Sequence, residues 1–282
     1  MGLDAREFLS KLQNDLASGS IEIAGFPDAC VRLLVELKDD FVSTQILERI
    51  VKSDPALTFR VISMANSAAY QSTTGPTHTV GGAISRIGLA ALRTVVLAYA
   101  FASLRELKLY KPVQGRMGEI WARCVSMATF ARALSTHVEG RRVDRDAMIL
   151  GGMLSGVGKI YILSEMAAHE EVLNDFAATE HLLQTWHVKL AQAMLSNWDF
   201  PSSVVRAATA SGDGKAPQSD DTVADLLHVA GMFADSNGDL EIVAPRLSTS
   251  GSAARLGLSQ VKPDLILELA RREAASFGGA LT

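Results

Sequence analysis

The sequence predicts an all-α fold, and three observations lead to this prediction. Alanine, leucine, methionine and arginine recur at spacings of three and four residues along most of the chain. Alternating β-branched residues, which are typical of strands, are almost absent. Serine and aspartate, which cap helix N-termini, stand before several of the periodic segments. Together these features indicate helices nearly throughout.

The first quarter of the chain predicts short, closely spaced helices. The first ends at Gly19, Phe26-Pro27 opens the second, Ser43-Thr44 caps the third, and Ser53-Asp54-Pro55 starts the fourth. Proline at the first helical position and serine or aspartate before it are helix-start signals. The apolar positions that define these helices are, in order, Leu3, Phe8, Leu12 and Leu16; Val31, Leu34 and Leu37 on one side; Ile46, Leu47 and Ile50; and Leu57, Val61, Met64 and Ala65, facing inward.

Longer helices are predicted in the rest of the chain. Thr79 begins a helix that Gly88 separates from the next one, and Asp144 caps a helix over 144–164. Further helices are expected over about 116–138, 180–197, 202–210 and 222–235, with a last one from Asp264. Residues 236–262 are rich in Ser, Gly, Asn and Pro, so they are the weakest region for helix.

Composition and charge narrow the class of protein. The 282 residues, 48% of them hydrophobic, can form a sizeable core, and Cys30 and Cys124 lie far apart among apolar neighbours, as core residues do. A net charge of −4 does not suit binding to nucleic-acid phosphates or anionic lipid. The N-terminal segment lacks a signal-peptide pattern, and the apolar stretches are shorter than a membrane span. We therefore expect a cytoplasmic protein with no membrane or nucleic-acid partner.

Several motifs, taken in order, resemble one family. They are SDPALTFRVISMANSAAY, AISRIGLAALRTVVLAYAF, Trp121, MLSGVGKI and WHVKLAQAMLSNWDFP. This series is similar to the HDOD domain, the HD-related output domain of bacterial signalling proteins. The resemblance implies a compact multi-helix HD-like bundle with an additional N-terminal helical subdomain. It also implies an N-terminal helix over 1–22, an HDOD-like domain over 23–218, and a C-terminal helical extension over 219–282 packed on the bundle.

The resemblance also allows the metal ligands of the related HD phosphohydrolases to be compared with this chain. Those enzymes hold a divalent metal with a His, an adjacent His-Asp pair and a later Asp, and the metal activates water. The matching positions here are Arg123, Ser155, Gly156 and Gly231, which we call the HD-equivalent positions. For the fourth, His228 and Asp235 stand one turn to either side as alternatives. None of the four is a metal ligand, so the resemblance implies a degenerate site without a metal cofactor.

Three residues form a candidate ligand pocket: Arg123, Lys159 and His187. Arg123 and Lys159 could make a cationic hollow for a phosphate or carboxylate. Alternatively, Arg123 pairs with a carboxylate such as Asp146 or Glu165, and Lys159 is solvated. His187 matches a histidine that the family often keeps, in the pattern His-x-x-x-Gly with alanine in place of the Gly, but we favour a core or helix-start histidine bonded to a backbone carbonyl.

The function implied is that of a non-enzymatic regulatory module in bacterial signal transduction, acting through protein contacts. The partner would be a separate receiver or cyclic-dinucleotide signalling protein. One alternative is a sensor that binds a nucleotide or another anion where the metal would lie. A second alternative is residual metal-dependent phosphohydrolase activity, which requires ligands other than the HD-equivalent positions.

Overall fold

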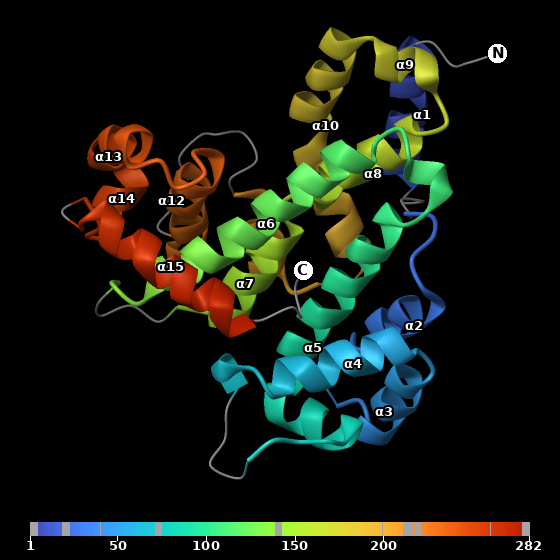
Figure 1. The fold of residues 1–282 in the computed structure, drawn as a ribbon. Coiled ribbons are helices and arrows are strands. Elements are labelled where there is room, and N and C mark those ends of the chain that lie inside the picture. The colour runs from blue at the N-terminus through green and yellow to red at the C-terminus, as the bar shows by residue number, and fades with distance from the viewer. Residues whose placement is uncertain are drawn as a thin grey trace. The chain divides into compact units, whose positions relative to one another are not determined.

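The computed structural model describes residues 5–18, 23–39, 41–70, 75–138, 143–198, 200–210, 217, 221–259 and 261–277. Every regular element within these ranges is a helix, which confirms the all-α prediction (Figure 1). The chain forms two compact units. Unit 1 comprises Met1–Ala24 and Arg105–Ile266, and unit 2 comprises Gly25–Leu104 and Leu267–Thr282.

Unit 2 is built from the early helices and the end of the chain. It contains α2 (Asp28–Glu36), α3 (Thr44–Lys52), α4 (Pro55–Ala65), the 3-10 helix η1 (Ala68–Tyr70), α5 (Val80–Arg105) as far as Leu104, and the part of α15 (Pro263–Phe277) that follows Ile266. Two predicted caps are confirmed. The Ser43 hydroxyl accepts the Gln45 N–H at 3.3 Å, and the Asp54 carboxylate accepts the Leu57 N–H at 3.0 Å. The first predicted end, Gly19, lies outside the described residues.

The Ala-Asn-Ser motif at the end of α4 has a structural role. The Asn66 side-chain amide donates to the Thr77 carbonyl and its oxygen accepts the Thr77 N–H, both at 2.8 Å. Arg86 donates to the Gly75 carbonyl at 2.8 Å and to the Ala65 carbonyl at 3.3 Å. These bonds hold the segment before α5 against the end of α4. Gly88 then interrupts α5 with φ 77°, a left-handed value that glycine tolerates, as the sequence predicts.

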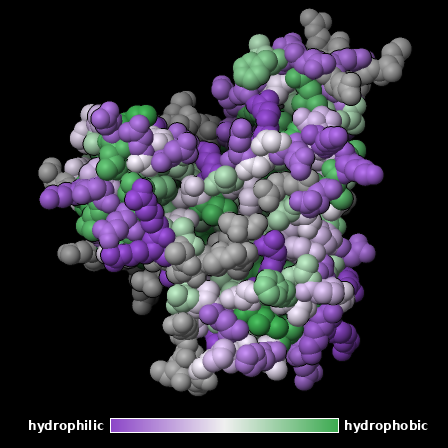
Figure 2. Space-filling model, viewed as in Figure 1, coloured by the Kyte–Doolittle hydropathy of each residue, from purple (hydrophilic) through white to green (hydrophobic). Residues whose placement is uncertain are grey.

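The three apolar residues expected on one side of α2 differ in burial. Leu37, just after the helix, is buried and Leu34 is half-buried, whereas Val31 is 47% exposed. The buried residues within the helix are Ala29, Cys30 and Leu33, so α2 is apolar on two sides. Large apolar side chains reach the surface elsewhere in unit 2, and Figure 2 shows hydrophobic groups among polar ones around α4.

Unit 1 contains the remaining helices. They are α1 (Ala5–Ser18), η2 (Lys108–Tyr110), α6 (Gln114–Ser135), α7 (Arg145–Leu154), α8 (Val157–Met166), α9 (Glu170–Asn174), α10 (Phe176–Asn197), α11 (Ser202–Thr209), α12 (Thr222–Asp235), α13 (Leu240–Thr249) and α14 (Gly251–Arg255), with the start of α15. The Asp144 cap of α7 is confirmed, since its carboxylate accepts the Ala147 N–H at 3.0 Å.

The single helix predicted over 144–164 is in fact two helices. The Ser155 N–H and hydroxyl both donate to the Gly152 carbonyl, at 3.3 and 2.8 Å, and this ends α7 with a tight turn. The Ile160 N–H then bonds to the Gly156 carbonyl and begins α8. The break is slight, since Ser155 and Gly156 keep nearly helical dihedral angles. A pattern of apolar residues in the sequence does not reveal so small a change.

Residues 236–262 contain two helices that composition did not indicate. Asp239 caps α13 and Ser250 caps α14. The fully buried Asp225 carboxylate of α12 accepts two bonds from the Arg255 guanidinium, one of them at 2.9 Å, and Arg255 also donates to the Pro217 carbonyl at 2.8 Å. Caps and a buried ion pair therefore order a segment rich in loop-forming residues.

Two helical stretches are longer than expected from the sequence, in which the apolar stretches are predicted to be shorter than a membrane span. Val80–Leu104 and Ala147–Met166 are each long and apolar enough to cross a membrane, but 61% and 89% of their most apolar windows are buried inside the protein. The first is interrupted at Gly88 and the second at Ser155-Gly156. Both stretches are used as core helices.

Both cysteines are buried, and burial raises the pKa of the Cys30 thiol to about 12.

Candidate functional site

Arg123 on α6 is held by neighbouring residues of unit 1. Its Nε donates to the Asp235 carboxylate at the end of α12, at 2.5 Å, and its Nη1 contacts the Met127 sulfur at 3.0 Å. The expectation that Arg123 pairs with a carboxylate is met, but Asp235 is the partner. Glu165 pairs instead with Lys11 of α1, and the Asp146 side chain lies outside what the structure describes.

The two positions that match the His-Asp pair are closed by packing. Ser155 is buried, and besides the Gly152 carbonyl its hydroxyl contacts the sulfur atoms of Met127 and Cys124 at 3.4 and 3.5 Å. A Cβ atom on Gly156 would lie 2.5 Å from Ile120 Cγ2 and 2.7 Å from Cys124 Sγ. Side chains of α6 therefore fill the space that a larger residue at position 156 would need.

Lys159 lies one turn after this pair and is half-buried. Burial lowers the pKa of its ammonium group, and the positive charge of Arg123 lowers it further, whereas Asp235 and Glu180 act in the opposite direction. Within the described part of the chain, no carboxylate lies within 4 Å of the Lys159 ammonium. Arg123 and Lys159 thus share one electrostatic environment, in which Arg123 is ion-paired and Lys159 is not.

His187 occupies a packing position in the middle of α10. The side chain is 4% exposed. Its backbone carbonyl approaches α8 so closely that a Cβ atom on Gly158 would lie 2.0 Å from the oxygen, and 3.0 Å from the Ala191 nitrogen. The residues His187 and Ala191, which match the family's His-x-x-x-Gly pattern, therefore form the contact surface for Gly158.

The fourth HD-equivalent position lies on α12, where Gly231 is buried and contributes no side chain. His228 is half-buried, and burial lowers the pKa of its imidazole, assisted by Arg246 and Arg255 and opposed by Asp225. Asp235 is already paired with Arg123. Among the residues that the structure describes, no three His, Cys, Asp or Glu side chains form a group able to hold a metal ion. These residues do not fit the metal centre of the HD phosphohydrolases.

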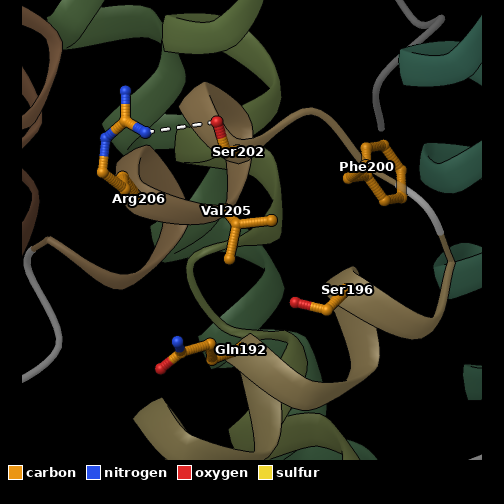
Figure 3. Close-up of a pocket in the computed structure, with 6 residues that line it drawn as sticks. All are labelled: Gln192, Ser196, Phe200, Ser202, Val205 and Arg206. Atoms are coloured by element: carbon orange, nitrogen blue, oxygen red, sulfur yellow. Dashed lines mark hydrogen bonds between the residues drawn. The ribbon is translucent and has the colours of Figure 1, made fainter.

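A cavity between α10 and α11 was not predicted from the sequence. It is a hollow of about 400 Å³ that is open to solvent, and its four polar lining residues are exposed; we call it the α10–α11 cavity (Figure 3). Its lining residues are Gln192, Ser196, Phe200, Ser202, Val205 and Arg206. On each helix the two polar residues stand four apart, which places them on one helical face. That spacing was visible in the sequence, but surface helices commonly carry polar residues in this way, so it gave no distinguishing signal.

Comparisons with known proteins place the chain in a family. The HDOD domain model matches residues 23–213. None of the curated proteins compared with the chain matches it significantly.

Solved structures share the fold along nearly the whole chain. A proposed metal-dependent phosphohydrolase from Shewanella amazonensis SB2B is 21% identical, with a TM-score of 0.73 over 97% of this chain and 99% of the other. An HDOD domain protein of unknown function from Geobacter sulfurreducens is 18% identical, with a TM-score of 0.62 over 96% and 97%. A proposed signal transduction protein from Marinobacter aquaeolei VT8 is 20% identical, with a TM-score of 0.55 over 95% and 65%. These identities support the shared fold, and the family match covers more than half of the sequence: the chain belongs to the HDOD domain family.

Proposed function

We propose that this protein is a non-enzymatic regulatory module of bacterial signal transduction, which acts through protein contacts. The observation that carries the proposal is the packing at Ser155 and Gly156. Ile120 and Cys124 fill the space beside Gly156, and the Ser155 hydroxyl is bonded within the protein. Without imidazole or carboxylate groups at these positions, activation of water by a bound metal has no structural basis.

Two further features support a role in protein contacts. Membership of the HDOD family is consistent with signalling, and Marinobacter aquaeolei provides a structure named for signal transduction. Unit 2 exposes the apolar side chains Val35, Phe41 and Phe59 by 57%, 96% and 72%. Exposed apolar residues of this size are common on protein interaction surfaces. The partner we propose is a receiver or cyclic-dinucleotide signalling protein.

The geometry supports a nucleotide sensor at Arg123, Lys159 and His187 less well. Such a sensor needs cations without an acidic partner, but Arg123 is paired with Asp235. The His187 side chain is only 4% exposed, and the backbone carbonyl of this residue packs against Gly158. Of these three residues, only Lys159 offers a cation that has no ion pair with a described residue. A ligand pocket at these three residues stays a prediction.

The test combines metal content, turnover and partner capture. We expect purified protein to hold far less than one equivalent of transition metal and to leave phosphodiesters intact with Mn²⁺, Mg²⁺ or Fe²⁺ added. Affinity capture from the source cell, with and without nucleotides, should recover the same partner. Near-stoichiometric tightly bound metal, with turnover that chelation abolishes, would overturn the proposal. No reproducible partner, with a clear thermal shift for one nucleotide, would favour the sensor.

A further inference from the structure

The α10–α11 cavity brings together polar side chains with unused hydrogen-bonding capacity. Gln192 and Ser196 lie on one wall, and Ser202 and Arg206 lie on the other (Figure 3). Neither the Gln192 amide nor the Ser196 hydroxyl bonds to any residue within the described ranges. Arg206 donates a hydrogen bond from Nε to the Asp221 carboxylate at 3.2 Å and another from Nη1 to the Ser202 hydroxyl at 3.3 Å. Its Nη2 group remains available to donate to a ligand. The amide and the hydroxyls can donate or accept, whereas Arg206 can only donate, so the cavity suits a ligand that accepts a hydrogen bond from the guanidinium.

The local charge limits how negative such a ligand can be. Among the described residues that line the cavity, Arg206 is the one cation, and the Asp221 carboxylate already lies against its Nε. The pair has no net charge, so a polyphosphate would bring several negative charges to a site that cannot neutralise them. A single carboxylate can instead receive the directional Nη2 bond and the hydroxyl and amide donors. The charge balance therefore favours a monoanion over a nucleotide.

The remaining lining residues and the volume of the cavity indicate the size and the apolar character of the ligand. Phe200 closes one end of the cavity and Val205 lies between the polar rows (Figure 3). The volume of about 400 Å³ is near the lower end of small-molecule sites, which span about 300–1,000 Å³. We propose that the α10–α11 cavity binds a small organic monocarboxylate, whose carboxylate meets Arg206 and whose short apolar body contacts Phe200 and Val205. This site is separate from the HD-equivalent positions and does not depend on their loss of metal ligands.

The proposal is tested by titrating isotope-labelled full-length protein with benzoate and hexanoate, followed by amide resonances of residues 192–206. We expect saturable shifts there, and much smaller ones for benzyl alcohol, which lacks the charge. The Arg206→Gln variant should weaken benzoate binding about tenfold, because it removes a charge-assisted hydrogen bond. The Gln192→Ala variant, at an exposed α10 position, should weaken it about threefold, as expected for loss of a neutral hydrogen bond.

Arg272→Gln serves as the matched control, because Arg272 is also an exposed arginine in an ion pair, with Glu268 on α15. It should bind benzoate as the native protein does. Three results would overturn the proposal: no saturable binding of either carboxylate, unchanged affinity in the Arg206 and Gln192 variants, or tighter binding of ATP or inorganic phosphate than of benzoate. Because none of these readouts involves a protein partner, failure here is distinguishable from failure of the regulatory role.

Discussion

Around the HD-equivalent positions, Arg123 donates to Asp235 and the Ser155 hydroxyl donates to the Gly152 carbonyl. In the α10–α11 cavity, by contrast, the Gln192 amide and the Ser196 hydroxyl have no bonding partner in the described structure. Both regions belong to unit 1 and both carry an arginine in an ion pair. The difference is that side chains fill the space beside Gly156 in one region, whereas the other retains an open volume.

The contrast shows that a sequence motif and a ligand-binding site can lie in different parts of one unit. The glycines of segment 151–158 stand where helices approach closely, as the Gly158 contact with α10 shows. Packing alone is therefore a sufficient reason for glycines in this motif. Capacity to bind a ligand is better judged from polar groups that the protein itself does not engage and from open volume, both of which the α10–α11 cavity has.

The largest predicted effect tests whether segment 151–158 is a packing element. Gly158→Ala places a Cβ atom 2.0 Å from the His187 carbonyl oxygen, and a backbone oxygen cannot move aside as a side chain can. We expect a loss of about 3 kcal/mol in the free energy of unfolding, measured by urea denaturation. Gly115→Ala in α6 is the control, since nothing lies within 4 Å of its new Cβ, and it should stabilise by less than about 1 kcal/mol. Equal effects of the two variants would contradict this interpretation.

The second prediction asks whether a metal site can be restored. The double variant Ser155→His, Gly156→Asp supplies the His-Asp pair of the HD phosphohydrolases but forces the new side chain at position 156 against Ile120 and Cys124. We expect a loss of about 1–3 kcal/mol in stability from overpacking, and well under one metal ion per chain by elemental analysis. One equivalent of bound Mn²⁺ together with a raised melting temperature would show that the region is open, as the α10–α11 cavity is.

Much of the fold was predictable from local signals, but the sites were less so. The caps at Ser43, Asp54 and Asp144 mark helix starts because their side chains satisfy nearby N–H groups, and such contacts are local in sequence. The helices within 236–262 also have local caps, at Asp239 and Ser250, but α14 is held in addition by the Asp225–Arg255 pair, whose members are thirty residues apart and have no sequence signature. The α10–α11 cavity was missed for the same reason, because ordinary surface residues become a site only when two helices face each other.

The third prediction concerns the ion pair at the HD-equivalent positions. Asp235→Asn leaves Arg123 without its partner and removes a carboxylate that favours the charged form of Lys159, so the pKa of Lys159 should fall further. Stability should drop by about 1 kcal/mol, since the pair is only partly buried. Glu268→Gln breaks the more exposed pair with Arg272 and should cost less than about 0.5 kcal/mol. Titration of the Lys159 side-chain resonances measures the pKa, and an unchanged value would show that Asp235 does not act on Lys159.

The smallest predicted effect concerns His228, one turn before the fourth HD-equivalent position. Burial, Arg246 and Arg255 lower the pKa of this imidazole in the folded protein. As the pH falls through the ordinary value of about 6.5, the unfolded chain takes up a proton that the folded protein does not, so stability decreases. Glutamine at position 228 does not titrate, so the His228→Gln variant should lose less stability than the native protein between about pH 7 and pH 5. Denaturation curves across this range measure the effect, and identical slopes for both proteins would count against it. Benzoate binding at the α10–α11 cavity should be unchanged in this variant, because His228 is not among the residues that line it.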